Sequence, residues 1–216
     1  MDFQDFLQYV PNLIPVELPA ELSHIKMAPK ERIQALKNLD VEARNPRIAA
    51  VMMLFYPKNG KTHLVLIVRN AYNGVHSSQI AFPGGKYEIS DFDFKDTALR
   101  ETNEEIGVLP EKIEVIKHFS PMYIPPSNFL VHPFLGIAKE ELSFYPDVRE
   151  VAGIIELPLS DFLNDDIIIE TTLSTSYAID AVVPAFGIQN HIVWGATAMI
   201  LSELRDVLKL TFEQKI

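Results

Sequence analysis

Residues 82–108 read FPGGKYEISDFDFKDTALRETNEEIGV and carry the strongest structural signal in this chain. Within this stretch, Glu101, Glu104 and Glu105 are spaced so that they share one face of a helix. Like charges at that spacing repel one another on an isolated helix unless a cation lies among them. Carboxylate oxygens are the ligands that Mg²⁺ and Mn²⁺ prefer, so the spacing indicates a site for a divalent metal ion.

A solvated helix face is the alternative interpretation of the three glutamates, because runs of charge usually indicate one. Leu99 and Ile106 fall on the roughly opposite side of the same helix, as a solvated face would require. Three neighbouring features favour the metal site. Arg100 can hold a carboxylate by a forked hydrogen bond, Gly107 can end the helix as a left-handed cap, and the glycine pair at 84–85 lets the backbone pass close to a ligand.

The residues RETNEEIGV at 100–108 resemble the second half of the Nudix hydrolase signature, which reads Arg-Glu, a spacer and then Glu-Glu-x-Gly. The first half departs from the family pattern. Its acidic position, counted from Gly85, is filled by Asp91 rather than by Glu, and one extra residue then precedes Arg100. That longer spacing behind Phe-Pro-Gly-Gly is similar to the branch of the family that cleaves coenzyme A.

The residues just before this stretch resemble a second, shorter motif of coenzyme A-type Nudix proteins. An apolar strand ends in Arg69, a loop follows, and QIAFPGG at 79–85 completes the motif. Two loop positions depart from it, because Gly74 stands where the motif has an arginine and Ser78 where it has a glycine. His76 is a candidate to replace that arginine, with an ordinary surface histidine as the alternative. These departures leave the identity of the substrate less certain than membership of the family.

The resemblance implies hydrolysis of coenzyme A to 4′-phosphopantetheine and adenosine 3′,5′-bisphosphate. Glu101, Glu104 and Glu105 would hold Mg²⁺ or Mn²⁺, which neutralise phosphate oxygens and activate water. Arg100 would orient these carboxylates, and one of the glutamates or Glu150 would take a proton from the attacking water. The residues expected to contact the substrate are Arg69, Gly84, Gly85, Lys86 and Ser127.

Alternatives to these expectations stay open at this point. Ser127 lies in a loop at 123–128 that two prolines stiffen, and that loop is either a border of the substrate cleft or a rigid connector. Glu150 is either catalytic or an exposed acid beside a strand. The substrate is either coenzyme A, free or acylated, or another nucleoside diphosphate derivative such as ADP-ribose or NADH. A further alternative for the whole protein is a Nudix fold that binds a ligand as a sensor and does not catalyse a reaction.

Composition agrees with a globular enzyme and excludes several other classes. The chain has 216 residues, of which 48% are hydrophobic, and it has no cysteine, which excludes disulfides and thiolate metal sites. A net charge of −10 without a basic stripe argues against nucleic acid as a partner. No signal peptide or membrane-spanning run is evident, so a cytoplasmic protein with a small-molecule substrate is expected. Assembly as a homodimer is left open.

The order of the segments predicts a mixed β-sheet with helices on both sides, and the Nudix resemblance implies the same α/β/α sandwich. Residues 1–45 are expected to form an N-terminal helical appendage, and residues 46–216 the Nudix domain. In the appendage, helical periodicity at 2–10 is expected to end at Pro11. An Asn-Gly pair at 59–60 between two apolar runs predicts a hairpin. Further strands are expected at 113–120, 129–137, 167–172 and 191–194, and helices at 30–39 and 196–210.

Overall fold

The computed structural model describes residues 1–36, 39–70, 79–173 and 180–213. The predicted hairpin is present, with β1 (Arg47–Lys58) and β2 (Lys61–Arg69) paired antiparallel. Asn59 and Gly60 form its turn with φ angles of 50° and 71°, the two positive values that a tight hairpin turn requires. The Asn-Gly signal therefore located this turn from local backbone preference alone.

Strand β1 is the centre of a mixed sheet. It pairs in parallel with β7 (Phe129–Ile137) and antiparallel with β2 and with β4 (Gly84–Lys86). The remaining strands of this sheet are β3 (Ile80–Ala81), β5 (Glu114–His118), β6 (Met122–Ile124) and β8 (Val151–Pro158). A second, antiparallel sheet consists of β9 (Ile168–Leu173), β10 (Ala181–Ile188) and β11 (His191–Val193).

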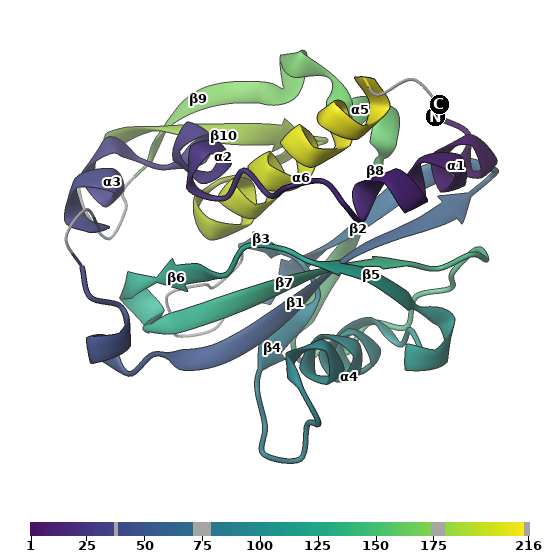
Figure 1. Ribbon diagram of the computed structural model, residues 1–216, viewed down its shortest axis with the longest axis horizontal. Helices are drawn as coiled ribbons and strands as arrows, with labels where there is room; N and C mark the ends of the chain where they lie inside the picture. Colours follow the sequence, from purple (N-terminus) through teal and green to yellow (C-terminus); the bar gives the residue numbers. More distant parts are fainter. Residues whose placement is uncertain (37–38, 71–78, 174–179, 214–216) are drawn as a thin grey trace.

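Helices cover both faces of the main sheet (Figure 1). Helix α4 (Phe94–Ile106) lies on one face, while α6 (Gly195–Glu213) lies on the other, together with the N-terminal helices and the small sheet. The other helices are α1 (Phe3–Leu13), α2 (Glu21–His24), α3 (Lys30–Leu36) and α5 (Leu159–Leu163), with 3₁₀ turns η1 (Ile25–Met27), η2 (Glu42–Arg44), η3 (Pro110–Lys112), η4 (Pro125–Ser127) and η5 (Asp165–Ile167). The predicted α/β sandwich is confirmed.

Alternate residues of β1 pack into opposite cores, because successive side chains of a strand point to opposite faces. Met53 and Phe55 join the core beneath α6, whereas Met52 and Leu54 join the core beneath α4, and all four are fully buried. A strand buried on both faces reads as a continuous apolar run. This explains why the segment RIAAVMMLFYPK carries few polar side chains.

The N-terminal helices share the core beneath α6. Phe6 and Leu13 of α1 are fully buried there, and the Lys117 ammonium of β5 donates to the carbonyls of Leu13, Ile14 and Val16. Pro11 lies inside α1, so the expectation that it ends the helix was wrong. The helix continues for two residues because burial of Leu13 and the Lys117 contacts stabilise its last turn. The division of the chain at residue 45 stays a prediction.

Candidate active site

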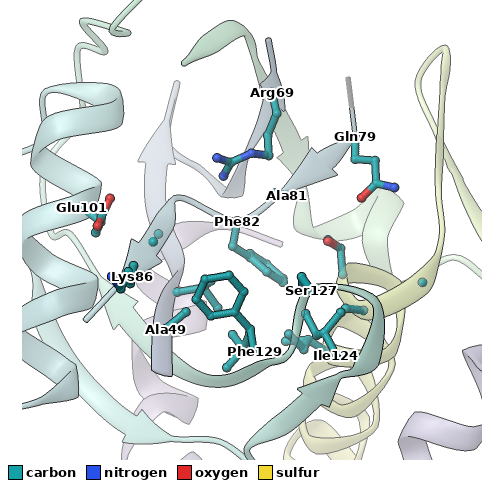
Figure 2. A pocket seen from close by; sticks show the side chains of 18 of the residues that line it. Ala49, Arg69, Gln79, Ala81, Phe82, Lys86, Glu101, Ile124, Ser127 and Phe129 are labelled. Atoms are coloured by element: carbon teal, nitrogen blue, oxygen red, sulfur yellow. The ribbon is translucent and has the colours of Figure 1, made fainter. Parts of the chain in front are cut away.

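A cavity of about 670 Å³ lies between α4, the strands β1 and β4, the turn η4 and the start of α6 (Figure 2). It brings together segments that are far apart in the chain. Of the ten site residues expected from the sequence, nine line this cavity: Arg69, Gly84, Gly85, Lys86, Arg100, Glu101, Glu104, Ser127 and Glu150. Glu105, the tenth, lies behind the cavity wall, where its carboxylate accepts a hydrogen bond from the Gly84 amide at 2.8 Å.

Local signals define both ends of the carboxylate helix. The Asp93 side chain accepts a hydrogen bond from the Asp96 amide and caps the first turn of α4. Gly107 ends the helix with φ 73°, a left-handed conformation that glycine adopts without a steric penalty. The buried face of the helix includes Ala98 and Ile106, which pack against the sheet. The glutamates are thereby directed away from the core beneath α4 and toward the edge of β4.

The three glutamates differ in their environments, which the helical spacing did not reveal. The side chain of Glu104 is 57% exposed, that of Glu101 15% and that of Glu105 only 3%. Burial raises the pKa of the Glu105 carboxyl to about 7, although the Gly84 amide and the Arg69 guanidinium, 3.4 Å away, partly oppose the shift. Burial also raises the pKa of Glu101. The site therefore combines exposed and buried carboxylates.

The two glycines of the β4 edge let the carboxylates approach the backbone. A Cβ atom added at Gly85 would lie 2.4 Å from the carboxylate carbon of Glu101. One added at Gly84 would lie 2.3 Å from the carbonyl oxygen of Ala50. A side chain at position 85 would collide with the Glu101 carboxylate, and one at position 84 would collide with the backbone of β1. The Gly-Gly pair is thus a steric requirement of this arrangement.

Arg100 organises the acidic wall through several hydrogen bonds. Its Nε and Nη2 donate to the two carboxylate oxygens of Asp91 at 2.7 and 3.0 Å. Its Nη1 donates to Glu101 at 3.0 Å and to Glu104 at 2.9 Å. This fork holds the pKa of Asp91 well below its usual range. Asp91, which the sequence placed at the acidic position of the signature, here fixes the orientation of Arg100.

The chemistry of these side chains fits a divalent metal ion. Glu150 lines the same cavity and, together with Glu101, raises the pKa of Glu105 through charge repulsion. Among the described residues, no three carboxylate or imidazole groups already converge on one point, and the Arg100 guanidinium pairs with Glu101 and Glu104. A set of oxygen donors beside a glycine backbone nevertheless suits a hard cation, which would relieve the repulsion between these carboxylates.

The opposite side of the cavity is mostly apolar. Figure 2 shows Ile124 and Ser127 across the cavity from Glu101, with the rings of Phe82 and Phe129 between them. Sequence reasoning missed two charged residues that also line the cavity, Glu88 and Arg32. Arg32 of α3 was missed because the helical pattern of residues 30–39 suggested only packing. The predictions for Gly74, His76 and Ser78 lie outside the described residues.

The fold is an α/β sandwich, and its cavity is an acidic, glycine-flanked candidate active site. The family model for the NUDIX domain matches residues 46–169, more than half of the chain. The chain therefore belongs to the Nudix hydrolase family, as the signature suggested. Members of this family act on small-molecule diphosphates and generally use divalent metal ions.

Two relatives extend the comparison. An uncharacterized Nudix hydrolase, NudL, from Photorhabdus laumondii is 34% identical over 173 residues, which cover 77% of this chain and 87% of that protein. The mouse protein named peroxisomal coenzyme A diphosphatase NUDT7 is 27% identical over 195 residues, 82% of each chain. Both similarities extend well beyond the signature itself.

Solved structures agree with the fold. A MutT/nudix family protein from Enterococcus faecalis superposes with a TM-score of 0.51 at 18% identity, covering 90% of this chain and 76% of that protein. The Nudix hydrolase RenU from M. smegmatis gives 0.50 at 16% identity, with coverages of 79% and 89%. Within the described part of the chain, no helix has the length and apolar character needed to cross a membrane.

Proposed function

We propose that this Nudix hydrolase cleaves the diphosphate bond of coenzyme A or an acylated derivative, producing 4′-phosphopantetheine, or its acyl form, and adenosine 3′,5′-bisphosphate. The observation that carries the proposal is that two separate sequence motifs line one cavity. Arg69 and the segment at 79–85 resemble the coenzyme A-type motif, and both border the cavity that contains Glu101. The similarity to the mouse protein named as a coenzyme A diphosphatase supports the same substrate.

The proposed metal ligands are the carboxylates of Glu101, Glu104 and Glu105, with Mg²⁺ or Mn²⁺ as the ion. A divalent ion held there would neutralise the phosphate oxygens and lower the pKa of the attacking water. Arg100 keeps Glu101 and Glu104 in place through the hydrogen bonds at 3.0 and 2.9 Å. Glu105 is fixed by the Gly84 amide, which leaves its second oxygen directed to the Arg69 guanidinium.

Other residues that line the cavity are proposed to accept the proton and to contact the substrate. Glu150 is exposed and lines the cavity, so its carboxylate is the proposed acceptor of the proton from water, with the helix glutamates as alternatives. Lys86 and Arg69 line the cavity beside the carboxylates and are proposed to contact the diphosphate. The glycine backbone at 84–85 leaves room for the phosphate to approach. The diphosphate would then be hydrolysed between the carboxylates of α4 and the cationic side chains of Lys86 and Arg69.

A panel of substrates tests the proposed reaction. Coenzyme A, ADP-ribose, NADH and a nucleoside triphosphate are compared at equal concentration with Mg²⁺ and with Mn²⁺. We expect the highest kcat/KM for coenzyme A. A higher value for any of the other three would reject coenzyme A as the preferred substrate, and no turnover of any diphosphate would favour a ligand sensor.

Two variants test the carboxylate roles. Glu104→Gln and Glu105→Gln should each abolish metal-dependent hydrolysis, because each removes a negative oxygen from the proposed ligand set. Glu111→Gln is the matched control, since Glu111 is an exposed acid in η3 outside the cavity lining. Undiminished activity of the Glu104 and Glu105 variants would contradict the assignment of the metal site.

A further inference from the structure

Arg32 places a positive charge in the cavity wall at the end remote from the carboxylates. It belongs to α3, within the N-terminal segment, and its side chain lines the cavity although the residue is only 5% exposed. Its Nη2 donates to the carbonyl oxygen of Tyr123 at 2.7 Å, which anchors it beside Ile124. Figure 2 shows Ile124 across the cavity from Glu101. A buried arginine in this position therefore faces a different part of any bound ligand than the acidic wall does.

The other cationic side chains that line the described part of the cavity lie beside its carboxylates. Arg100 is bound to three carboxylates, and Arg69 contacts the Glu105 carboxylate at 3.4 Å. Lys86 follows the glycine pair on β4, and Figure 2 shows it near Glu101. Arg32 thus differs from the other cationic side chains that line the described part of the cavity, because its hydrogen bond to Tyr123 holds it beside Ile124, across the cavity from Glu101 (Figure 2).

A second polar group lies at the same end as Arg32. The hydroxyl oxygen of Ser127 is buried and has no hydrogen-bond partner among the described residues, and Ser127 lines the cavity. A buried hydroxyl without a partner carries a free-energy cost that a bound acceptor would relieve. Arginine and a hydroxyl donor are a common combination for a phosphate group, since the guanidinium offers a fork of donors to its oxygens.

We propose that Arg32 and Ser127 form a subsite for a phosphate monoester of the substrate, separate from the diphosphate that is cleaved. The inference rests on the proposed function, because coenzyme A carries such a group, the 3′-phosphate of its adenosine. On this assignment the diphosphate lies against the carboxylate helix and the 3′-phosphate lies against α3. The N-terminal segment then determines specificity, by selecting substrates with the additional phosphate over those that lack it.

The test compares coenzyme A with dephospho-coenzyme A, which differs only by loss of the 3′-phosphate. For the unmodified protein we expect kcat/KM to favour coenzyme A by about 10- to 100-fold, the range expected for hydrogen bonds to a charged group. Arg32→Gln should raise KM for coenzyme A more than it lowers kcat, and should reduce the preference to about onefold on the same basis. Arg32→Lys, which keeps the charge and loses the fork, should retain part of the preference.

Arg47→Gln is the matched control. The Arg47 guanidinium donates to the Ser127 carbonyl at 2.7 Å, so it also tethers η4, but Arg47 does not line the cavity. This variant should keep the preference for coenzyme A. If Arg32→Gln lowers kcat/KM equally for both substrates and keeps the preference, Arg32 only supports the fold and the inference is wrong.

A measurement on the unmodified protein covers the case in which Arg32→Gln fails to fold. Adenosine 3′,5′-bisphosphate should inhibit at least about tenfold more strongly than adenosine 5′-monophosphate, because only the former carries the 3′-phosphate. Equal inhibition would reject the subsite while leaving the hydrolysis of coenzyme A in place. Turnover of ADP-ribose or NADH without turnover of either form of coenzyme A would reject the proposed function, and the subsite with it.

Discussion

Replacing Gly85 by alanine tests whether the close approach of Glu101 to the glycine backbone is needed for catalysis. The added Cβ would lie 2.4 Å from the Cδ and Oε2 atoms of Glu101 and 2.5 Å from its Oε1. The carboxylate must therefore move by about 1 Å to reach the 3.4 Å at which ordinary contact begins. A displacement of about 1 Å costs on the order of 10²-fold in rate when it misplaces a catalytic group. We expect kcat to fall by that factor.

The fold should tolerate the Gly85→Ala change, because the atoms that must move are at the end of a flexible side chain. Gly84→Ala is the informative comparison. Its Cβ would meet the Ala50 carbonyl at 2.3 Å and Val51 Cα at 2.6 Å, both backbone atoms of β1, and φ at Gly84 is 153°. We therefore expect Gly84→Ala to lower the free energy of unfolding by roughly 1–3 kcal/mol or more, and Gly85→Ala to change it by less than about 1 kcal/mol.

The assay is kcat for a diphosphate substrate at saturating Mg²⁺, combined with urea unfolding of both variants. Loss of activity in Gly85→Ala with an unchanged unfolding midpoint would support the steric role of this glycine. A Gly85→Ala enzyme with kcat within about threefold of the unmodified protein would refute the reasoning, since a 1 Å displacement is expected to cost far more.

Three further predictions concern polar groups outside the cavity lining that bear on the stability of the fold. Lys117→Met removes the ammonium bonds to the end of α1 and should lower the free energy of unfolding by about 1–3 kcal/mol; an unchanged urea midpoint would argue against this role. Glu203 is fully buried in α6 and accepts hydrogen bonds from Ala20, His24 and Ser120, so Glu203→Ala should cost about 3–5 kcal/mol in the same measurement, and a loss below about 1 kcal/mol would be inconsistent with it. Burial lowers the pKa of His132 to about 4 from 6.5, so the unfolded chain binds more protons as the pH falls below 6.5. The stability contributed by neutral His132 is complete above pH 6.5 and should decrease by up to roughly 3 kcal/mol toward pH 4, a loss that His132→Gln should reduce; parallel urea midpoints for the two proteins across this range would exclude it.

Local signals were sufficient to predict the carboxylate helix and the hairpin. Gly107 and Asn59-Gly60 adopt the positive φ angles that their residue types favour, and these preferences act within a few residues. The spacing of Glu101, Glu104 and Glu105 likewise placed them on one helix with the Arg100 fork. Such features depend on neighbours in the chain, so the sequence alone predicts them.

Features that depend on distant parts of the chain were not predicted. The different burial of Glu104 and Glu105 depends on where the β4 edge lies against α4, and helical spacing contains no information about that packing. Arg32 reaches the cavity because α3 lies beside Tyr123 of β6, 91 residues further along the chain. Lys117 remained unnoticed for the same reason, since its carbonyl partners lie in the N-terminal segment.

Product analysis of coenzyme A hydrolysis tests the central claim most directly. The protein is incubated with coenzyme A and Mg²⁺, and the products are separated and identified by mass. We predict equimolar 4′-phosphopantetheine and adenosine 3′,5′-bisphosphate, formed by the unmodified protein and absent with Glu104→Gln. Intact coenzyme A under conditions in which ADP-ribose or NADH is cleaved would contradict the account.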